Sequence, residues 1–306
     1  MTNFGAKILN NAVSSLAAQQ ALIANAGNNI ANVNTTGYTR RSIELQTRFG
    51  GLGTTGIQIG NGVQVGGIRR IADEFLEKLL RESQASRSSY QTQDEFLSRI
   101  ENLFSLTGDR PTIGSSLTSF YAAINDLSLN PSSIELRSNL IQKAQDLVEN
   151  IRNTYNTLAN LQSEADQRIG VELQTVNSIT AQIANLNTLI SQREAAGENI
   201  IASDERDARD QLLKELSEKL SFNKVELPDG SVTLTLSNGF ALVNGSNSRA
   251  LSLTTAPSFA TSTLPPSLGG GVLGYIVYDY SAGSGTAHVD FTQDLMAGGG
   301  SIGGLL

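Results

Sequence analysis

A single histidine limits the catalytic chemistry open to this chain of 306 residues. His288 lies two positions before Asp290, and alternate residues of a strand point to the same face, so the two could form a His–Asp pair that assists a serine nucleophile. A lone histidine in a strand more often has a surface or hydrogen-bonded role. We therefore expect no enzyme, and keep a ligand-binding or enzymatic module around His288 and Asp290 as a minor alternative.

The sequence contains no cysteine, which excludes further chemistry. Thiolate nucleophiles, thiolate metal sites and disulfides all need cysteine, and the common zinc sites need several histidine or cysteine ligands. The sequence therefore predicts no cofactor, no catalytic residues and no metal centre.

Four acidic residues lie close together and could suggest a cation site: Asp204, Glu205, Asp207 and Asp210. The stretch lacks the glycine and the distal glutamate of a calcium-binding loop. Opposite charges also recur four residues apart, at Glu205–Arg209, Arg206–Asp210, Asp210–Lys214 and Glu215–Lys219. Such pairs stabilise an exposed helix by a few tenths of a kcal/mol each. We predict a solvated, charge-paired helix face rather than a metal site.

The stretch Gly51-Leu52-Gly53-Thr54-Thr55-Gly56 matches the letters of the dinucleotide-binding fingerprint. That fingerprint needs a strand before the glycines and a helix N-terminus after them, which holds the pyrophosphate. Here Ile57-Gln58-Ile59-Gly60 continues as extended chain. We therefore expect a glycine-rich arm and no nucleotide.

The charge balance narrows the function further. Lys and Arg number 22 against 29 Asp and Glu, a net charge of −7, whereas nucleic-acid binding needs a basic surface. No apolar run reaches the ~18–20 residues that span a membrane, and residues 1–31 lack the pattern of a secretory signal. We expect a structural or interaction protein, with neither nucleic acid nor a membrane as partner.

The apolar pattern of residues 4–32 predicts a helix that packs against a partner. Its seam recurs at alternating steps of four and three residues, the heptad spacing of a coiled coil: Leu9, Val13, Leu16, Gln20, Ile23, Gly27 and Ile30. A seam this thin favours a helix that orders only on packing. We predict an assembly interface formed by Leu9, Val13, Leu16, Ile23 and Ile30.

Further helices are predicted at about 72–105, 113–127 and 204–220, and a much longer one between Pro131 and Ala196. Ser132 and Glu135 have the spacing of a capping box at its start, and its length would be about 90 Å at ~1.5 Å per residue. Residues 34–70 are glycine-rich with short extended strands. Residues 222–291 alternate apolar and polar positions between Asp229-Gly230 and Asn238-Gly239 turns, a β pattern.

The expected fold class is mainly α with a β-rich second domain (α+β): an elongated helical bundle with long heptad-patterned helices, a glycine-rich extended arm and a small antiparallel β domain. The predicted domains are an N-terminal assembly helix (1–33), the arm (34–70), an elongated helical bundle (71–220) and a β-rich outer domain (221–306).

The stretch from Asn28 to Arg41, NNIANVNTTGYTRR, resembles the N-terminal signature of flagellar rod, hook and hook-associated proteins. Other stretches narrow the resemblance to the hook–filament junction family, hook-associated protein 1 (FlgK): Gly62–Val65, Arg69–Leu76, Asn130-Pro131-Ser132 with Arg137, Gln182–Asn187, Asp207–Leu213 and the terminal Gly-Ser-Ile-Gly-Gly-Leu-Leu. The resemblance covers essentially the whole chain. It implies a family turn motif at Asn28, Asn29, Ile30, Asn32, Asn34, Gly37 and Tyr38.

The resemblance implies a structural adaptor between hook and filament, exported by the flagellar type III apparatus and located outside the cell at that junction. The implied partners are the flagellar hook protein, the second hook-associated protein and copies of the chain itself in a tubular ring. Another axial subunit, from the rod or hook, is the main alternative.

The family continues past the Gly-Gly-Leu-Leu stretch into C-terminal helices that pack beside the N-terminal one. We expect this chain to lack them, and with them the segment that would bind an export chaperone.

Overall fold

The computed structural model describes residues 3–48, 60–104, 111–197, 201–255, 259–268, 273–282 and 285–306. The chain forms two compact units. Unit 1 comprises Met1–Glu82, Ser178–Leu216 and Phe222–Ser248, and unit 2 comprises Ser83–Asn177, Ser217–Ser221 and Arg249–Leu306. Each unit therefore combines segments that are far apart in the sequence, and the predicted division into four consecutive domains stays a prediction.

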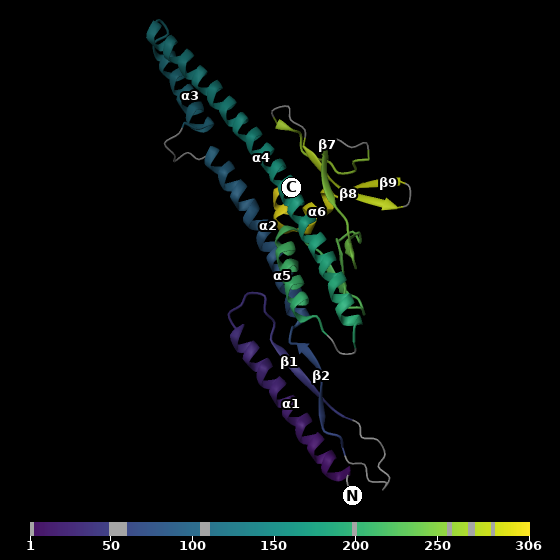
Figure 1. Cartoon of the computed structure of the whole chain (residues 1–306). Coiled ribbons are helices and arrows are strands. Elements are labelled where there is room, and N and C mark those ends of the chain that lie inside the picture. The colour runs from purple at the N-terminus through teal and green to yellow at the C-terminus, as the bar shows by residue number, and fades with distance from the viewer. Residues whose placement is uncertain are drawn as a thin grey trace. The chain divides into compact units, whose positions relative to one another are not determined.

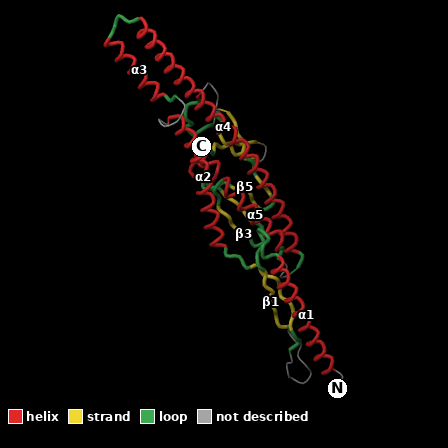
Figure 2. Tube along the Cα trace, turned by 90° about the vertical axis from the view of Figure 1, so that its left-hand side faces the viewer, coloured by secondary structure: helices red, strands yellow, loops and turns green. Residues whose placement is uncertain are grey.

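In unit 1, helix α1 (Asn3–Ala31) lies along a hairpin of β1 (Arg41–Thr47) and β2 (Val63–Arg70), as Figures 1 and 2 both show. The two strands are antiparallel, and the register places Arg41 opposite Arg70, with a bulge between Glu44 and Leu45. The predicted helix and the short strands of the arm are confirmed.

Unit 1 also holds a four-stranded antiparallel sheet in the order β3-β4-β5-β6. Its strands are β3 (Asn223–Glu226), β4 (Val232–Thr235), β5 (Ala241–Asn244) and β6 (Asn247–Ser248). The predicted turns are present, with Gly230 and Gly239 at φ of 79° and 87°. Fully buried side chains of this unit come from its sheet and from two helices: Val232, Leu234, Leu242, Ile183, Ile190, Leu213 and Leu216.

Three long helices follow the predicted bounds closely: α2 (Glu74–Phe104), α4 (Ile134–Ala195) and α5 (Ser203–Lys219). Residues of α2, α4 and α5 are divided between the two units. The predicted capping residue of α4 is wrong by one position. The Leu136 amide donates to Ser133 Oγ at 3.2 Å, so Ser133, rather than Ser132, satisfies one of the free amides at the helix start.

Unit 2 adds α3 (Ile113–Leu129), which lies beside the first part of α4 (Figure 1), and a three-stranded antiparallel sheet. The sheet consists of β7 (Leu251–Thr255), β8 (Gly274–Ala282) and β9 (Gly285–Asp290). Its buried residues include Leu251, Ile276 and Tyr278, and α4 contributes Ile169 and Leu173. The expected class, long helices with small antiparallel sheets, is confirmed.

The chain then forms two short helices that the sequence analysis did not predict, α6 (Thr292–Gly298) and α7 (Gly300–Leu305). A glycine-rich stretch indicates a loop by propensity, but here the missing side chains permit close packing. A Cβ on Gly304 would lie 2.5 Å from the Ser89 carbonyl oxygen and 2.9 Å from Thr92 Cβ, both on α2. The face of α2 that receives α7 is accordingly small: Ala85, Ser89 and Thr92 are its buried residues.

Substituting Gly304 by Ala should therefore destabilise unit 2 by about 1–3 kcal/mol, because the backbone of α2 cannot move aside easily. Gly170→Ala is the matched control, since its Cβ would lie 3.8 Å from Leu253 Cδ2, an ordinary contact. That change in mid-helix should stabilise the protein by up to ~1 kcal/mol. Urea unfolding followed by circular dichroism measures both. Equal midpoints for the two variants would contradict close packing of α7.

Candidate functional site

Helix α1 has two opposite faces with opposite chemistry. The predicted interface residues Leu9, Val13, Leu16, Ile23 and Ile30 are 59–75 % exposed. At about 100° of rotation per residue, Asn11, Ser14, Ala18, Asn25 and Asn29 lie on the other side, and they are buried or partly buried. The apolar seam therefore faces away from the hairpin, and it is mainly small or polar residues of α1 that pack against the hairpin.

Asparagine side chains fix α1 to the arm, residues 34–70. Asn25 Nδ2 and Asn29 Nδ2 both donate to the Arg41 carbonyl oxygen at 2.9 Å. In return the Arg41 amide and the Tyr38 hydroxyl donate to Asn29 Oδ1, at 3.0 and 2.8 Å. Asn29 is thus bonded to two positions of the arm, and α1 and the start of β1 are held as one body.

The structure brings together most of the predicted turn motif. The Asn32 amide and side chain both donate to the Asn28 carbonyl, at 3.1 and 3.0 Å. Gly37 has φ of 84°, a conformation that glycine adopts at little cost, and the Tyr38 amide then donates to the Thr35 carbonyl. Asn34 is exposed in the turn, and Ile30 belongs to the exposed seam. The motif's role in assembly stays a prediction.

The arm is bonded to α5 by an arginine–aspartate cluster made of Arg41, Arg70, Asp204, Asp207 and Asp210. Asp207 accepts from Arg41 Nη2 at 3.2 Å and from Arg70 Nε at 2.9 Å. Arg70 Nη2 also donates to Asp210 at 2.5 Å, and Arg41 Nη2 to Asp204 at 2.5 Å. Partial burial acts to lower the pKa of Arg41. The hydrogen bonds and charges of Asp204 and Asp207 outweigh this effect, and the net shift of the pKa is upward.

This cluster corrects the prediction of a solvated helix face. Asp207, Arg209 and Asp210 are 8, 1 and 7 % exposed. Their partners come from other elements rather than from the next turn of α5, and Glu205 likewise pairs with Arg193 at 2.6 Å. Charges four residues apart fit a buried face as well as an exposed one when each has a partner elsewhere.

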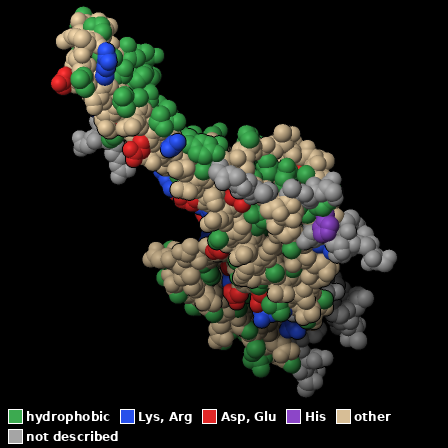
Figure 3. All heavy atoms as spheres, turned by 90° about the horizontal axis from the view of Figure 1, so that it is seen from above, with side chains coloured by type: hydrophobic (Ala, Val, Ile, Leu, Met, Phe, Trp, Pro, Cys, Tyr) green, Lys and Arg blue, Asp and Glu red, His purple; other side chains and the backbone are tan. Residues whose placement is uncertain are grey.

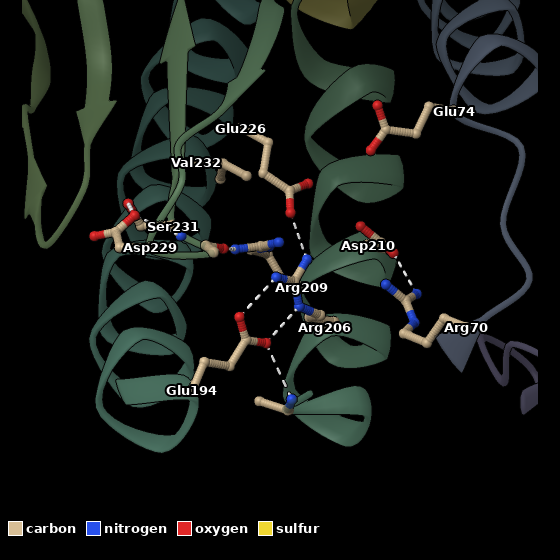
Figure 4. A network of polar contacts seen from close by, with 12 residues as sticks. Arg70, Glu74, Glu194, Arg206, Arg209, Asp210, Glu226, Asp229, Ser231 and Val232 are labelled. Atoms are coloured by element: carbon tan, nitrogen blue, oxygen red, sulfur yellow. Dashed lines mark hydrogen bonds and ion pairs between the residues drawn. The ribbon is translucent and has the colours of Figure 1, made fainter. Parts of the chain in front are cut away.

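A second network joins α4, α5 and the four-stranded sheet of unit 1, as Figure 4 shows. Arg206 donates to Glu194 at 2.7 and 2.8 Å and to Glu226 at 2.5 Å. The hydrogen bonds to Glu194 have the largest effect on the pKa of Arg206 and raise it. Burial acts to lower this pKa, and the hydrogen bond to Glu226 raises it further. Burial by itself would raise the pKa of Glu194, but the bonds from Arg206 outweigh it, and the net shift is downward.

Asn187 on α4 is the most fully used polar side chain of this network. Its Nδ2 donates to the carbonyls of Val232 and Gly245 at 2.9 and 2.7 Å. Its Oδ1 accepts from the Val232 amide at 3.1 Å and from Arg209 Nη1 at 3.0 Å. Arg209 also donates to the Gly230 carbonyl at 2.7 Å, and burial lowers its pKa. Asn187 therefore fixes β4 and the turn between β5 and β6, and it positions a buried guanidinium.

Replacing Asn187 by Ala should destabilise the protein by about 2–4 kcal/mol, because three buried groups and the partly buried Gly245 carbonyl lose a partner at once. Asn185→Ala is the control, since Asn185 lies two residues away and is exposed, and its effect should stay within about 0.5 kcal/mol. Urea unfolding measures both variants. A loss below about 1 kcal/mol in Asn187→Ala would contradict this role.

Acid should weaken unit 1 through Glu194, whose pKa is lowered in the folded state. The unfolded chain then binds more protons at this group, so its stabilisation is complete above the unfolded pKa of about 4.3 and is lost as the pH falls through the folded value. Urea midpoints measured from about pH 7 to about pH 3 should therefore fall less steeply for Glu194→Gln than for the wild type. Parallel curves would contradict the assignment.

The residues of the catalytic alternative have other roles in unit 2. Asp290 is 7 % exposed and accepts bonds from the amides of Thr261, Ser262 and Thr292 at 2.7–3.0 Å. Against the opposing effect of burial, these bonds lower its pKa. The exposed His288 ring stacks on Phe259 with the centroids 5.5 Å apart. Asp290 thus ties a loop to the start of α6.

The stretch Gly299-Gly300-Ser301-Ile302-Gly303 has the letters of a serine nucleophile elbow. Such an elbow exposes its serine between a strand and a helix, whereas Ser301 is 6 % exposed and lies on α7, directly after another helix. The nucleotide fingerprint at 51–56 lies outside the described residues. Among the described residues, no group of three or more possible metal ligands is found, and no helix is long and apolar enough to cross a membrane.

Comparison with known families decides where this architecture belongs. A family model described as the flagellar hook-associated protein FlgK helical domain matches residues 97–306, and one for flagella basal body rod proteins matches residues 9–39. The first match covers more than two thirds of the sequence. The chain belongs to the FlgK family of flagellar hook-associated proteins.

Individual relatives agree with membership of the FlgK family. The chain is 33% identical to flagellar hook-associated protein 1 of Salmonella typhimurium over 299 residues, which is 98% of this chain and 51% of that protein. It is 33% identical to the Bacillus subtilis protein of the same name over 219 residues, 68% of this chain and 43% of the relative. The chain thus spans about half the length of these relatives.

A solved structure supports the fold. The flagellar hook junction protein FlgK from Burkholderia pseudomallei matches with a TM-score of 0.61 and 24% sequence identity, over 74% of this chain and 38% of that one. At this identity the likeness concerns the fold alone, and it agrees with the long helices and small sheets described above.

The contacts that several residues of this FlgK-family chain make between distant segments were not predicted from the sequence. Arg70, Asn187, Asp207, Arg209 and Asp210 all lie within stretches that carried the family resemblance. The signal was therefore present, but a family motif does not say which of its residues meet. The structure shows that three of these stretches meet in unit 1, through Arg70, Asp207 and the segment that ends at Arg41.

Proposed function

We propose that this chain is part of a structural adaptor that joins the flagellar hook to the filament, and that it acts by helix packing without catalysis. Membership of the FlgK family supports the proposal, and the exposed apolar seam of α1 carries the mechanism. A helix that turns its large apolar residues to solvent and its asparagines inward is suited to a second binding surface. The proposed place of action is the hook–filament junction outside the cell, reached by flagellar type III export.

The seam defines what kind of partner fits. Leu9, Val13, Leu16, Ile23 and Ile30 follow heptad spacing, so the complementary surface is another helix with apolar residues at the same spacing. The proposed partners are copies of this chain in a ring, the hook protein and the second hook-associated protein. Burial of the five exposed side chains would supply roughly 1.5–3 kcal/mol for each that becomes fully buried.

The double variant Leu16→Asp/Ile23→Asp should abolish incorporation into the flagellum, because two charges would be buried in an apolar seam. Its fold should be unchanged, since both side chains are exposed in the chain alone. The measurement is a motility and electron-microscopy assay in a strain that carries the variant as its sole copy, with circular dichroism of the purified chain.

The matched control is Ser15→Asp/Ala26→Asp. It adds the same charge to the same helix at exposed positions that lie off the seam, and it should assemble normally. Normal incorporation of the Leu16→Asp/Ile23→Asp variant would contradict the proposed interface.

A second candidate function is that of a different axial subunit, from the rod or hook. Two observations favour it: the rod-protein family model matches residues 9–39, and the rod protein FlgG of Caulobacter vibrioides is 35% identical over 80 residues. Electron microscopy of cells without the gene separates the two functions. Finished bare hooks with filament protein in the medium support the junction, and missing hooks support the rod or hook.

A further inference from the structure

Two arginines face each other at the open end of the β1–β2 hairpin. Arg41 and Arg70 are directly opposed in the antiparallel register, and their side chains are 15 and 11 % exposed. Like charges opposite each other destabilise a pair of strands, and partial burial strengthens the repulsion because solvent screens it less. The hairpin end therefore needs a negative group between the two guanidinium groups.

Asp207 supplies that group. Its two carboxylate oxygens are divided between the arginines, Oδ2 to Arg41 and Oδ1 to Arg70, and Oδ2 also accepts from the Thr39 amide at 3.4 Å. Asp204 and Asp210 each pair with one of the two arginines. Of the three aspartates, Asp207 alone among the described contacts bridges both strands.

The cluster that holds the arm against α5 leaves some of its buried polar atoms without a hydrogen-bond partner. Two buried atoms of the same cluster, Arg41 Nε and Asp210 Oδ1, have no hydrogen-bond partner in the described structure. Separation of the arm from α5 would return both atoms to water. A polar network with unsatisfied members gains less than a complete one, so the docked state depends on its central bridge.

We propose that Asp207 is a positioning residue that holds the arm on α5 and thereby sets the direction of α1. The link to α1 runs through the Arg41 backbone, which Asn25 and Asn29 bind. This inference deepens the proposed function, because it names the residue that sets the direction of the assembly helix α1. It rests on the proposed function only in giving that direction a role in assembly. The docking itself is a property of the isolated chain.

The absence of native cysteine allows a direct test with two introduced spin labels, at Ser15→Cys on α1 and Glu215→Cys on α5, both exposed. Pulsed electron paramagnetic resonance measures the distance between the two labels. It should give one narrow distance distribution in the parent and a broad or shifted one in Asp207→Asn. Asp204→Asn is the matched control. The Asp204 side chain is 79 % exposed, and its variant should keep the parent distribution. An unchanged distribution in Asp207→Asn would overturn the proposal.

A second measurement separates positioning from a general structural role. The Ile71 amide donates to the Arg40 carbonyl at 2.9 Å and so reports on the hairpin end. Its hydrogen-exchange protection should fall on the order of 100-fold in Asp207→Asn. Adding Arg41→Gln and Arg70→Gln should restore most of that protection by removing the repulsion, while the distance stays broad. Failure of the added substitutions to restore it would overturn the role assigned to the opposed arginines.

If Asp207→Asn does not fold by circular dichroism, Arg41→Gln/Arg70→Gln takes its place. We expect a broad distance distribution with full Ile71 protection, and a narrow distribution would overturn the proposal. These readouts use the isolated chain, so they can succeed even if the Leu16→Asp/Ile23→Asp variant assembles normally. In that case the positioning role stands and the proposed interface fails.

Discussion

Helices α1 and α2 pack against their own chain mainly through small or amide-bearing residues, unlike α4 and α5, which bury isoleucine and leucine, and the way these two helices are held depends on this constraint. In α1 the inward residues are asparagine, serine and alanine together with the partly buried Leu22, and in α2 the buried residues are Ala85, Ser89 and Thr92. The apolar seam of α1 points outward, and in α2 the large residues Leu76, Leu79 and Leu97 are 58, 53 and 60 % exposed. Figure 3 shows hydrophobic side chains at the surface of the face that it draws. Apolar burial alone therefore cannot specify how these segments dock.

Polar side chains on α4 supply much of the missing specificity within each unit. In unit 2, Asn177 bonds both the amide and the carbonyl of Leu251, and Asp166 accepts from the Gly274 amide. In unit 1, Asn187 does the same for β4. Each such bond contributes only about 0.5–1.5 kcal/mol, but a slip of one residue would leave buried groups unpaired at a cost of ~1–3 kcal/mol each. The register of the strands is thus fixed by side chains that form hydrogen bonds with the backbone of particular residues.

Much of the fold was predictable because its signals are local. Heptad spacing predicted α1 and α4, and alternation with Asp-Gly and Asn-Gly turns predicted the strands after Phe222. The inward face of α1 was not predicted, because an apolar seam indicates where a partner helix binds and not which partner it has. Helix α7 was not predicted because glycine has a low helix propensity. Gly303 and Gly304 are present because neighbouring backbone leaves no space for a side chain. The role of Asp207 was missed because its partner Arg70 lies 137 residues away.

This difference in sequence separation also orders the formation of the structure. The bonds of Asn25 and Asn29 to Arg41 span 16 and 12 residues, so α1 and the start of β1 can associate with a small loop-closure cost. The bridge from Asp207 spans well over a hundred residues, so its loop-closure cost is larger and we expect it to form later. Until then Arg41 and Arg70 repel each other at the hairpin end. In the proposed arrangement the direction of α1 is therefore fixed last.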